Sequence, residues 1–361
     1  MPSIFNYSRS ELGDVLVELG HQRFRAEQIM RWIYHQDVTD FSAMENLPKA
    51  LRSELAGQFV TALPIAQSEH ISGCGTVKWL FSMDSKNAVE TVYIPESRRA
   101  TLCISSQIGC ALACQFCATG LAGFLRNLST AEIISQVYAA KERLAIIAPD
   151  QPKITNIVFM GMGEPLLNVE NVFRAVDILL DDLAFGLSKY RVTVSTSGII
   201  PAIRRLTTDC KAALAISIHA ADNDVRDQIV PINRKHPLKK LIEACDAYTQ
   251  ATNRPITYEY VMLKDINDRP QDANKLAKLL ASRKAKVNLI PYNPVPELAL
   301  ASSSSERIEA FKRRLNQSGI VTTVRKTRGD DINAACGQLF GQVTERNKRI
   351  DTYQFHRADC A

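Results

Sequence analysis

The sequence predicts an α/β protein built on a parallel sheet, preceded by a helical region and a β-hairpin. From residue 101 onward, short β-rich runs alternate with helical stretches, and this alternation is typical of a parallel sheet. Residues 1–70 carry apolar side chains at helical spacing, and residues 77–82 and 88–94 flank a turn-like segment, as in a hairpin. We therefore divide the chain into a helical accessory domain (1–70), a hairpin linker (71–98), an α/β domain (99–341) and a basic C-terminal tail (342–361).

Each element follows from a local pattern. In the first region, apolar periodicity after a cap or a break predicts helices at residues 8–19, 25–35 and 47–59. In the α/β domain, β-rich runs predict strands at residues 101–105, 156–160, 191–195, 214–218, 256–262, 286–290 and 320–324. Helical spacing between these runs predicts helices such as 130–143, 169–181, 238–252 and 273–282.

Composition limits the class of protein. With 361 residues, 46% hydrophobic and 23% charged, the chain resembles an ordinary soluble globular protein. It contains no apolar run of membrane-spanning length and no signal-peptide layout, so we expect a cytoplasmic protein without a membrane partner. Nine cysteines in such a chain favour metal ligands, catalytic thiols or buried side chains over a disulfide scaffold. The net charge of +6 does not identify a partner on its own.

The most informative motif is the run Cys110-x-x-x-Cys114-x-x-Cys117. It supplies three thiolates, whereas a cluster of four irons needs four ligands, so one iron stays open for chemistry. A structural zinc site is the alternative, but such sites are closed by four ligands, usually in paired C-x-x-C blocks, and no second block is present. The spacing resembles the signature of radical S-adenosylmethionine (SAM) enzymes. This resemblance implies two cofactors, a 4Fe-4S cluster and SAM.

Unusual residues gather where the predicted strands end. The cysteine motif follows the first strand, and the later strands are followed by 161–165, 196–198, 217–219, 291–294 and 325–337. The carboxyl ends of parallel strands form one face, on which α/β proteins build their sites. We therefore expect a single catalytic face.

Several polar residues on this face suit the binding of a cofactor, although each could equally have a purely structural role. Gly163 and Glu164 follow an apolar strand, where glycine lets a ligand approach the backbone; a simple strand-to-helix turn has the same spacing. Ser195, Ser217 and His219 end strands, where they would face a ribose or a carboxylate, or would be packed and capped.

Asn293 stands between two prolines in a rigid loop, which suits contact with the edge of a base and equally suits a turn. Cys103 lies in the first strand, where alternation allows it to point into the site. Cys336 lies in a loop rich in arginine, and neighbouring cations lower the pKa of a thiol. Both cysteines would otherwise be buried hydrophobes. Glu90 is a lone acid in an apolar strand, so it is either an edge residue or a buried base.

Clusters of cations are candidate phosphate contacts, although each alone is typical of a solvated face. They are Arg98-Arg99, Arg204-Arg205, the run 234–236, Lys239-Lys240, and Arg325, Lys326 and Arg328.

Further segments extend the resemblance over nearly the whole chain. They are residues 24–26, 31–34, 89–95, 105–110, 126–129, 195–198, 217–220 and 325–337. Together with Cys103 and Cys336, they resemble the RlmN/Cfr family of radical SAM RNA adenine methyltransferases. The resemblance implies a partial (β/α)6 radical SAM barrel, with the helical accessory domain gripping RNA.

The resemblance also implies a role for each candidate residue. Cys110, Cys114 and Cys117 would ligate the cluster. Cys336 would take a methyl group from one SAM, and a radical made from a second SAM would remove a hydrogen from that group before the carbon adds to adenine. Glu90 would accept the ring proton, and Cys103 would attack the Cys336 sulfur to release the RNA, leaving a transient disulfide bond. SAM would be held by Gly163, Glu164, Ser195, Ser217, Ile218, His219 and Asn293.

The implied substrates are 23S rRNA and tRNA, methylated at carbon 2 of an adenosine, with electrons from a flavodoxin- or ferredoxin-type donor. Carbon 2 is electron-poor and lacks an acidic proton, so a radical carbon reacts where simple methyl transfer fails. The Cfr branch acts at carbon 8 instead, and the helical N-terminal region and the cluster loop favour carbon 2. From another class, the alternative is a non-catalytic, metal-bearing RNA-binding protein.

Overall fold

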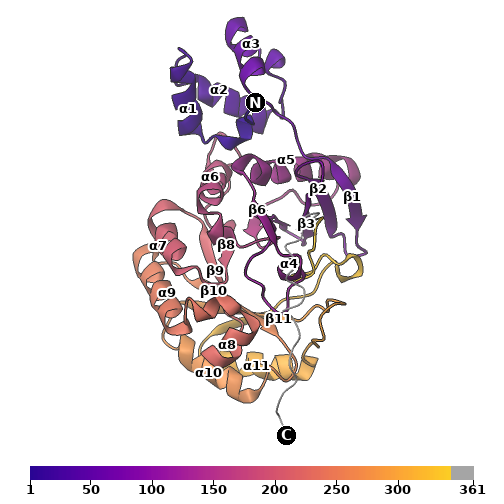
Figure 1. Cartoon of the computed structure of the whole chain (residues 1–361), viewed down its shortest axis with the longest axis vertical. Helices are drawn as coiled ribbons and strands as arrows, with labels where there is room; N and C mark the ends of the chain where they lie inside the picture. The colour runs from indigo at the N-terminus through magenta and orange to yellow at the C-terminus, as the bar shows by residue number, and fades with distance from the viewer. Residues whose placement is uncertain (343–361) are drawn as a thin grey trace.

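The computed structural model describes residues 1–342, so the expected basic tail lies outside the described residues except for its first position. A ten-stranded sheet, in the order β1-β2-β3-β4-β7-β8-β9-β10-β11-β12, forms the larger part of the molecule, and a smaller helical part lies at one end (Figure 1). The predicted α/β class is confirmed.

Seven strands form the parallel part of the sheet, close to their predicted positions. They are β4 (Ala100–Cys103), β7 (Asn156–Phe159), β8 (Val192–Thr196), β9 (Ala213–Ser217), β10 (Ile256–Met262), β11 (Ala285–Pro291) and β12 (Val321–Val324). Each pairs in parallel with the next, but β4 and β12 do not pair with each other. The parallel part is therefore an open, partial barrel.

Helices connect these strands and cover the outside of the sheet (Figure 1). They are α5 (Thr130–Ile147), α6 (Val169–Leu180), α7 (Ile200–Asp209), α8 (Asn223–Ile229), α9 (Leu238–Thr252), α10 (Pro270–Leu280) and α11 (Ser305–Gln317). The apolar face of each long helix packs against the sheet, as the helical periodicity predicts. No helix in the described part of the chain is long and apolar enough to cross a membrane.

The antiparallel strands continue the same sheet beyond β4. The predicted hairpin is β2 (Val77–Ser82) and β3 (Ala88–Pro95), and β1 (Ala66–Ile71) adds a further strand outside it. Because β3 also pairs with β4, the hairpin forms a wall that extends the barrel.

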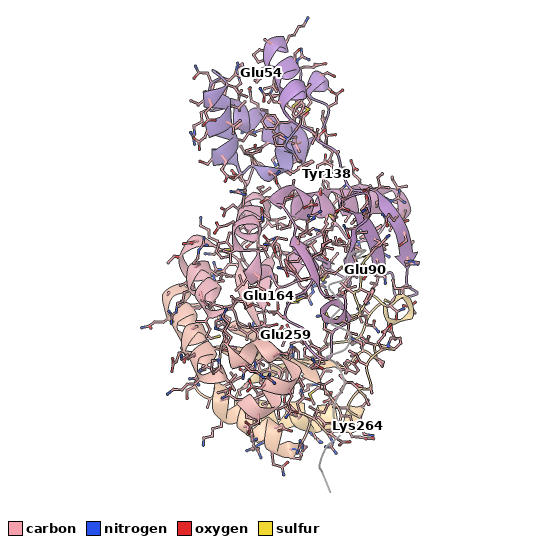
Figure 2. All side chains as sticks on the ribbon, viewed as in Figure 1. Glu54, Glu90, Tyr138, Glu164, Glu259 and Lys264 are labelled. Atoms are coloured by element: carbon pink, nitrogen blue, oxygen red, sulfur yellow. The ribbon has the colours of Figure 1, made fainter. Side chains whose placement is uncertain are left out.

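The N-terminal part is helical, as expected. It contains α1 (Arg9–Glu18), α2 (Arg25–Met30), a π-helical turn (Arg31–His35) and α3 (Lys49–Gln58). Tyr138 on α5 lies at the junction, where its hydroxyl donates to the carbonyl of Ile33 at 3.0 Å and its ring packs beside Phe5 (Figure 2). Aromatic packing therefore fixes the helical part against α5.

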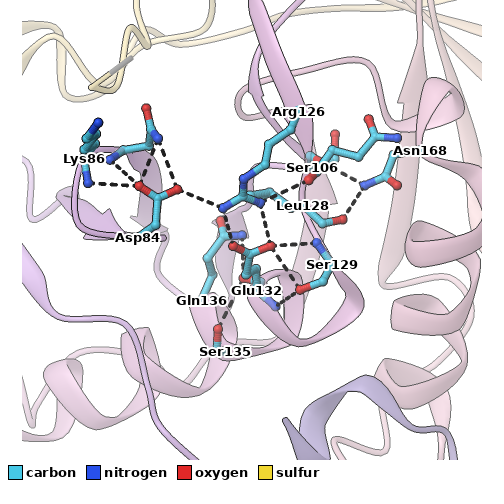
Figure 3. A network of polar contacts seen from close by, with 12 residues as sticks. Asp84, Lys86, Ser106, Arg126, Leu128, Ser129, Glu132, Ser135, Gln136 and Asn168 are labelled. Atoms are coloured by element: carbon cyan, nitrogen blue, oxygen red, sulfur yellow. Dashed lines mark hydrogen bonds and ion pairs between the residues drawn. The ribbon is translucent and has the colours of Figure 1, made fainter. Parts of the chain in front are cut away.

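A small two-stranded sheet and a polar network support the cysteine motif. β5 (Gln107–Gly109) and β6 (Phe124–Asn127) flank it, with the short α4 (Ala118–Leu121) between them. Arg126 on β6 binds both oxygens of Glu132 at 2.8 and 3.0 Å and reaches Asp84 at 3.1 Å (Figure 3). Glu132 and Ser129 form a capping box that begins α5.

We predict that Ser129→Ala lowers the free energy of unfolding by about 1 kcal/mol, because the first turn of α5 loses an acceptor for a free backbone amide. Urea unfolding measures this change. Ser85→Ala, at an exposed position of the β2–β3 turn, is the control and should change stability by less than about 0.5 kcal/mol. Equal effects of the two substitutions would contradict a capping role.

Candidate active site

A cavity of about 150 Å³ lies at the carboxyl ends of the parallel strands. Six of the seven residues expected to hold SAM line it, namely Gly163, Glu164, Ser195, Ser217, His219 and Asn293. Cys117 and Cys336 line it as well. The side chain of Ile218 does not, because it is fully buried in the core. The structure thus brings together residues from loops that are far apart in the sequence.

Glu164 is held by backbone amides at one side of this cavity. Its carboxylate accepts hydrogen bonds from the amides of Ser197 at 2.8 Å and Leu166 at 3.0 Å. Burial raises its pKa to about 7, against the lowering effect of these hydrogen bonds. Figure 2 shows Glu164 and Glu259 in the interior of the larger part of the molecule. A buried carboxyl group of this kind gains most from a cationic partner.

His219 is fixed in one orientation and one tautomer. Its Nδ1 accepts from the amide of Val261 at 3.1 Å, which leaves the ring proton on Nε2. Burial, with the nearby charge of Arg226, lowers its pKa to about 3, so the ring is neutral. The ring packs edge-on against Phe116 in the cysteine loop, with 4.7 Å between centroids. His219 is therefore a neutral donor beside that loop.

Arg226 was not expected from the sequence, yet it ties the strand ends together. Its side chain has no exposed surface, and burial lowers its pKa to about 10. It donates to the carbonyls of Ser197 at 2.7 Å, Ile218 at 2.9 Å and Ser217 at 3.1 Å. A single arginine on a helix gives no sequence signal for such a role, because most arginines are solvated.

The three cysteines of the motif share one loop. Burial and the neighbouring thiols raise the pKa of Cys110 well above its usual range and that of Cys114 to about 12. In residues 1–342, no three side chains of His, Cys, Asp or Glu are gathered closely enough to hold one metal ion. The ligands of a 4Fe-4S cluster bind different irons, so they need not converge on one point. Three thiols without a fourth ligand therefore fit such a cluster with an open iron.

Tyr292 supplies an independent sign that the cavity takes a polar group. Tyr292 lines the cavity, and its buried hydroxyl meets no well-aligned hydrogen-bond partner in the described part of the chain, although the backbone of Val295 interacts with it. An unpaired buried hydroxyl costs free energy, so it suits a bound ligand that completes the hydrogen bond. The residues present thus fit SAM.

Cys336 and Cys103 lie close together beside Arg325. Burial raises the pKa of Cys103 to about 12, the charge on Cys336 raises it further, and Arg325 lowers it. The lowered pKa expected for Cys336 is wrong, because burial outweighs the effect of Arg325 and raises its pKa. The eight cysteines in the described residues are free, so the expected disulfide bond is not supported by this structure.

Hydrogen bonds from several parts of the fold hold the loop that contains Cys336. The Asn293 amide donates to the carbonyl of Cys336 at 3.1 Å, and the amide of Ala118 donates to the carbonyl of Gly337 at 2.8 Å. Asp331 accepts from the Ser72 hydroxyl at 2.6 Å, in the β1–β2 turn. The cysteine loop, the strand ends and the hairpin therefore all position this thiol.

Glu90 lies on the inner face of the hairpin wall. The register places Lys78, Val92 and Cys103 in one row across β2, β3 and β4, and alternation puts Glu90 on the same face. Lys78 binds the Glu90 carboxylate at 2.8 Å and donates to the carbonyl of Asn333 at 3.1 Å. Glu90 is thus no edge residue, since β3 is paired on both sides.

The second carboxylate oxygen of Glu90 holds the end of the described chain. It accepts from the amides of Phe340 at 2.6 Å and Gly341 at 3.2 Å. The Thr119 hydroxyl donates to the carbonyl of Leu339 at 2.6 Å. We call residues 339–342 the closing segment, because they follow Cys336 and lie across Glu90.

Comparison with known proteins identifies the family. Residues 3–60 match the family model described as the ribosomal RNA large subunit methyltransferase N-terminal domain, and residues 104–277 match that of the radical SAM superfamily. A dual-specificity RNA methyltransferase RlmN from Alcanivorax borkumensis is 47% identical, over 99% of this chain and 96% of that protein. The chain belongs to the RlmN family of radical SAM RNA methyltransferases.

A solved structure agrees with this assignment to the RlmN family. The crystal structure of a radical SAM methyltransferase from Sphaerobacter thermophilus has a TM-score of 0.87 and 42% sequence identity, and the match covers 94% of this chain and 99% of that chain. Membership of the radical SAM superfamily implies a 4Fe-4S cluster and SAM as the cofactors.

We predict that Gly109→Ala lowers the iron and sulfide content of protein reconstituted without oxygen. Gly109 precedes the first cluster cysteine at φ +74°, and a Cβ there would lie 1.8 Å from the carbonyl oxygen of Gly123, so the loop has to move. Gly186→Ala is the control, because its φ is +61° but nothing lies within 4 Å of the added carbon. Equal iron content in both variants would show that the contact does not position the loop.

We also predict that Lys78→Met destabilises the protein by about 3–5 kcal/mol, because it leaves the buried Glu90 carboxylate without its cation. Urea unfolding is the measurement. Lys312→Met removes an exposed ion pair with Glu309 and should cost less than about 1 kcal/mol. The double variant Lys78→Met/Glu90→Gln should be more stable than Lys78→Met alone, because it leaves no unpaired charge. If the double variant instead loses the sum of the two single losses in unfolding free energy, the two residues do not form a stabilising pair.

Proposed function

We propose that this chain methylates carbon 2 of an adenosine in 23S rRNA and of an adenosine in the tRNA anticodon loop, with Cys336 as the carrier of the methyl group. The observation that supports this most is a second thiol, Cys103, which is buried and within electrostatic reach of Cys336. Cys336 itself lines the cavity together with Cys117, whereas Cys103 lies behind the lining. A binding protein needs no such pair. A methyl carrier needs a second thiol, which breaks the sulfur link by thiol exchange.

The residues around the cavity suit the binding of SAM. Glu164 would accept a hydrogen bond from its amino group, and the buried Tyr292 hydroxyl would gain a well-aligned partner. Ser195, Ser217 and Asn293 offer further polar contacts. Cys110, Cys114 and Cys117 would hold the cluster, which when bound supplies the electron that converts SAM to a radical.

The remaining residues act on the methyl group and the base. Cys336 attacks the methyl carbon of a first SAM as a nucleophile, and Arg325 favours its thiolate form. After a covalent bond forms between this carbon and adenine, Glu90 accepts the ring proton. The Cys103 thiolate then attacks the Cys336 sulfur, which forms an S–S bond and breaks the S–C bond; the electron pair leaves with the carbon, which takes up a proton to become the methyl group of the released RNA. The two joined sulfurs must be reduced to free thiols before the next turnover.

The partners follow from this activity. RNA is the substrate class named for the RlmN relative, and that name favours carbon 2 over the carbon 8 chemistry of the Cfr branch. The reaction needs a one-electron donor, for which we propose a flavodoxin or a ferredoxin. Free thiols and RNA substrates both suit the reducing environment of the cytoplasm.

We predict that Cys103→Ala traps the protein covalently on RNA, because the adduct forms but the sulfur link cannot be broken. An anticodon stem–loop RNA, SAM and dithionite are supplied without oxygen, and denaturing gel electrophoresis detects a shifted band that nuclease removes. Cys210→Ala, a buried cysteine remote from the cavity, is the control and should release 2-methyladenosine normally. Free methylated RNA at the normal rate from Cys103→Ala would overturn the proposed role, and 8-methyladenosine from the unaltered protein would overturn the proposed position.

A further inference from the structure

A second cavity, of about 370 Å³, lies on the other side of Cys336 and has no role in the site described so far. It occupies the gap between β12, the last strand of the sheet, and the paired strands β3 and β4 at the other side of the partial barrel. Thr101 on β4 and Ile94 on β3 line one side, and Thr323 and Val324 on β12 line the other. Its volume is in the range of cavities that hold small organic ligands.

Cys336 is part of the boundary between the two cavities. Four residues line both of them, namely Ile290, Asn293, Arg325 and Cys336. A thiol that takes a carbon from one substrate and passes it to another needs access to both. If the cavity at the strand ends holds SAM, the cavity in the gap is in the right position to hold the RNA base that receives the carbon.

The gap cavity is strongly cationic. Its lining contains Arg99, Arg325, Lys326 and Arg328, and its only carboxylate in the described residues is Glu96. Glu96 is already paired with Arg99. Arg325 and Arg328 also act electrostatically on Glu96, so four cations face this one carboxylate. Such a site attracts an anion, and along RNA the anions are phosphates.

Part of the lining is apolar. Ile94, Ile290 and Val324 offer surfaces against which a base removed from its stack can pack. Arg325 lies beside the two thiols, whereas Arg99 and Lys326 are exposed. A lining that combines apolar side chains, a thiol and exposed cations suits the two parts of a nucleotide, its base and its phosphate.

We propose that the gap between β4 and β12 is the binding site for the target nucleotide of the RNA, with its base against Cys336 and its flanking phosphates on Lys326, Arg328 and Arg99. This inference rests on the proposed function and adds to it the place where the RNA is bound. In the proposed arrangement, the cations on the two edges of the barrel hold the RNA backbone on either side of the base.

The test measures RNA affinity at several salt concentrations for the double variant Lys326→Ala/Arg328→Ala, with an anticodon stem–loop RNA as the probe. Each phosphate contact in single-stranded RNA contributes about 0.7 to the slope of log affinity against log salt, so the slope should fall by about 1.4. Affinity at low salt should also fall. A slope and an affinity equal to those of the unaltered protein would overturn the proposal.

The matched control is Lys189→Ala/Lys211→Ala, which also removes two exposed cations. These lysines precede β8 and β9, so they lie at the opposite end of the strands from the cavities. This variant should keep the normal slope. An equal fall in both variants would mean that net charge alone is measured, and would overturn the proposed site.

Two further measurements separate this inference from the proposed function and from misfolding. Methylation of Cys336, detected by mass spectrometry of the purified protein, requires SAM but not the gap, so the double variant should retain it. Failure of the unaltered protein to methylate Cys336 would instead refute the methyl-carrier role. Arg99→Ala tests the other edge independently and should lower the slope by about 0.7; no change there would contradict binding across the gap.

Discussion

The arrangement of the cavity at the strand ends depends on one buried cation. Arg226 joins the ends of β8 and β9 by donating to the carbonyls of Ser197, Ser217 and Ile218. Parallel strands leave such carbonyls without partners where the sheet ends, and a guanidinium with several fixed donors satisfies them together. Glu164 accepts a hydrogen bond from the amide of Ser197, whose carbonyl Arg226 holds, so its position is coupled to the same arginine. The His219 ring is held instead by the amide of Val261 on β10.

Because the barrel is not closed, Cys336 lines a second cavity in addition to the one at the strand ends. A closed barrel would have paired β4 with β12 and left only the strand ends accessible. Here the loop that contains Cys336 crosses the opening, and the hairpin wall supports it through Lys78 and Ser72. The hairpin, which follows the helical region in the sequence, pairs with β4, extends the barrel and places Glu90 on its inner face.

The sequence predicted the α/β class, the seven parallel strands and the face on which the site lies, because strand alternation and glycine-rich strand ends are local patterns. It also identified the cysteine motif, whose three thiols are neighbours in the chain. It could not predict Arg226 or Lys78, whose roles depend on partners in distant segments. The expected low pKa of Cys336 failed for a related reason, since burial is a property of the whole fold.

The carboxylate of Glu90, the proposed proton acceptor, contacts Lys78 and also accepts hydrogen bonds from the backbone amides of the closing segment. A carboxylate accepts hydrogen bonds strongly, and its protonated form accepts them weakly. A proton taken from adenine would therefore loosen residues 340 and 341 at the moment when the base is finished. In the proposed function, the acid that receives the ring proton is thus also the group that binds the backbone beyond Cys336, so the chemistry of the base and the position of that backbone share one side chain.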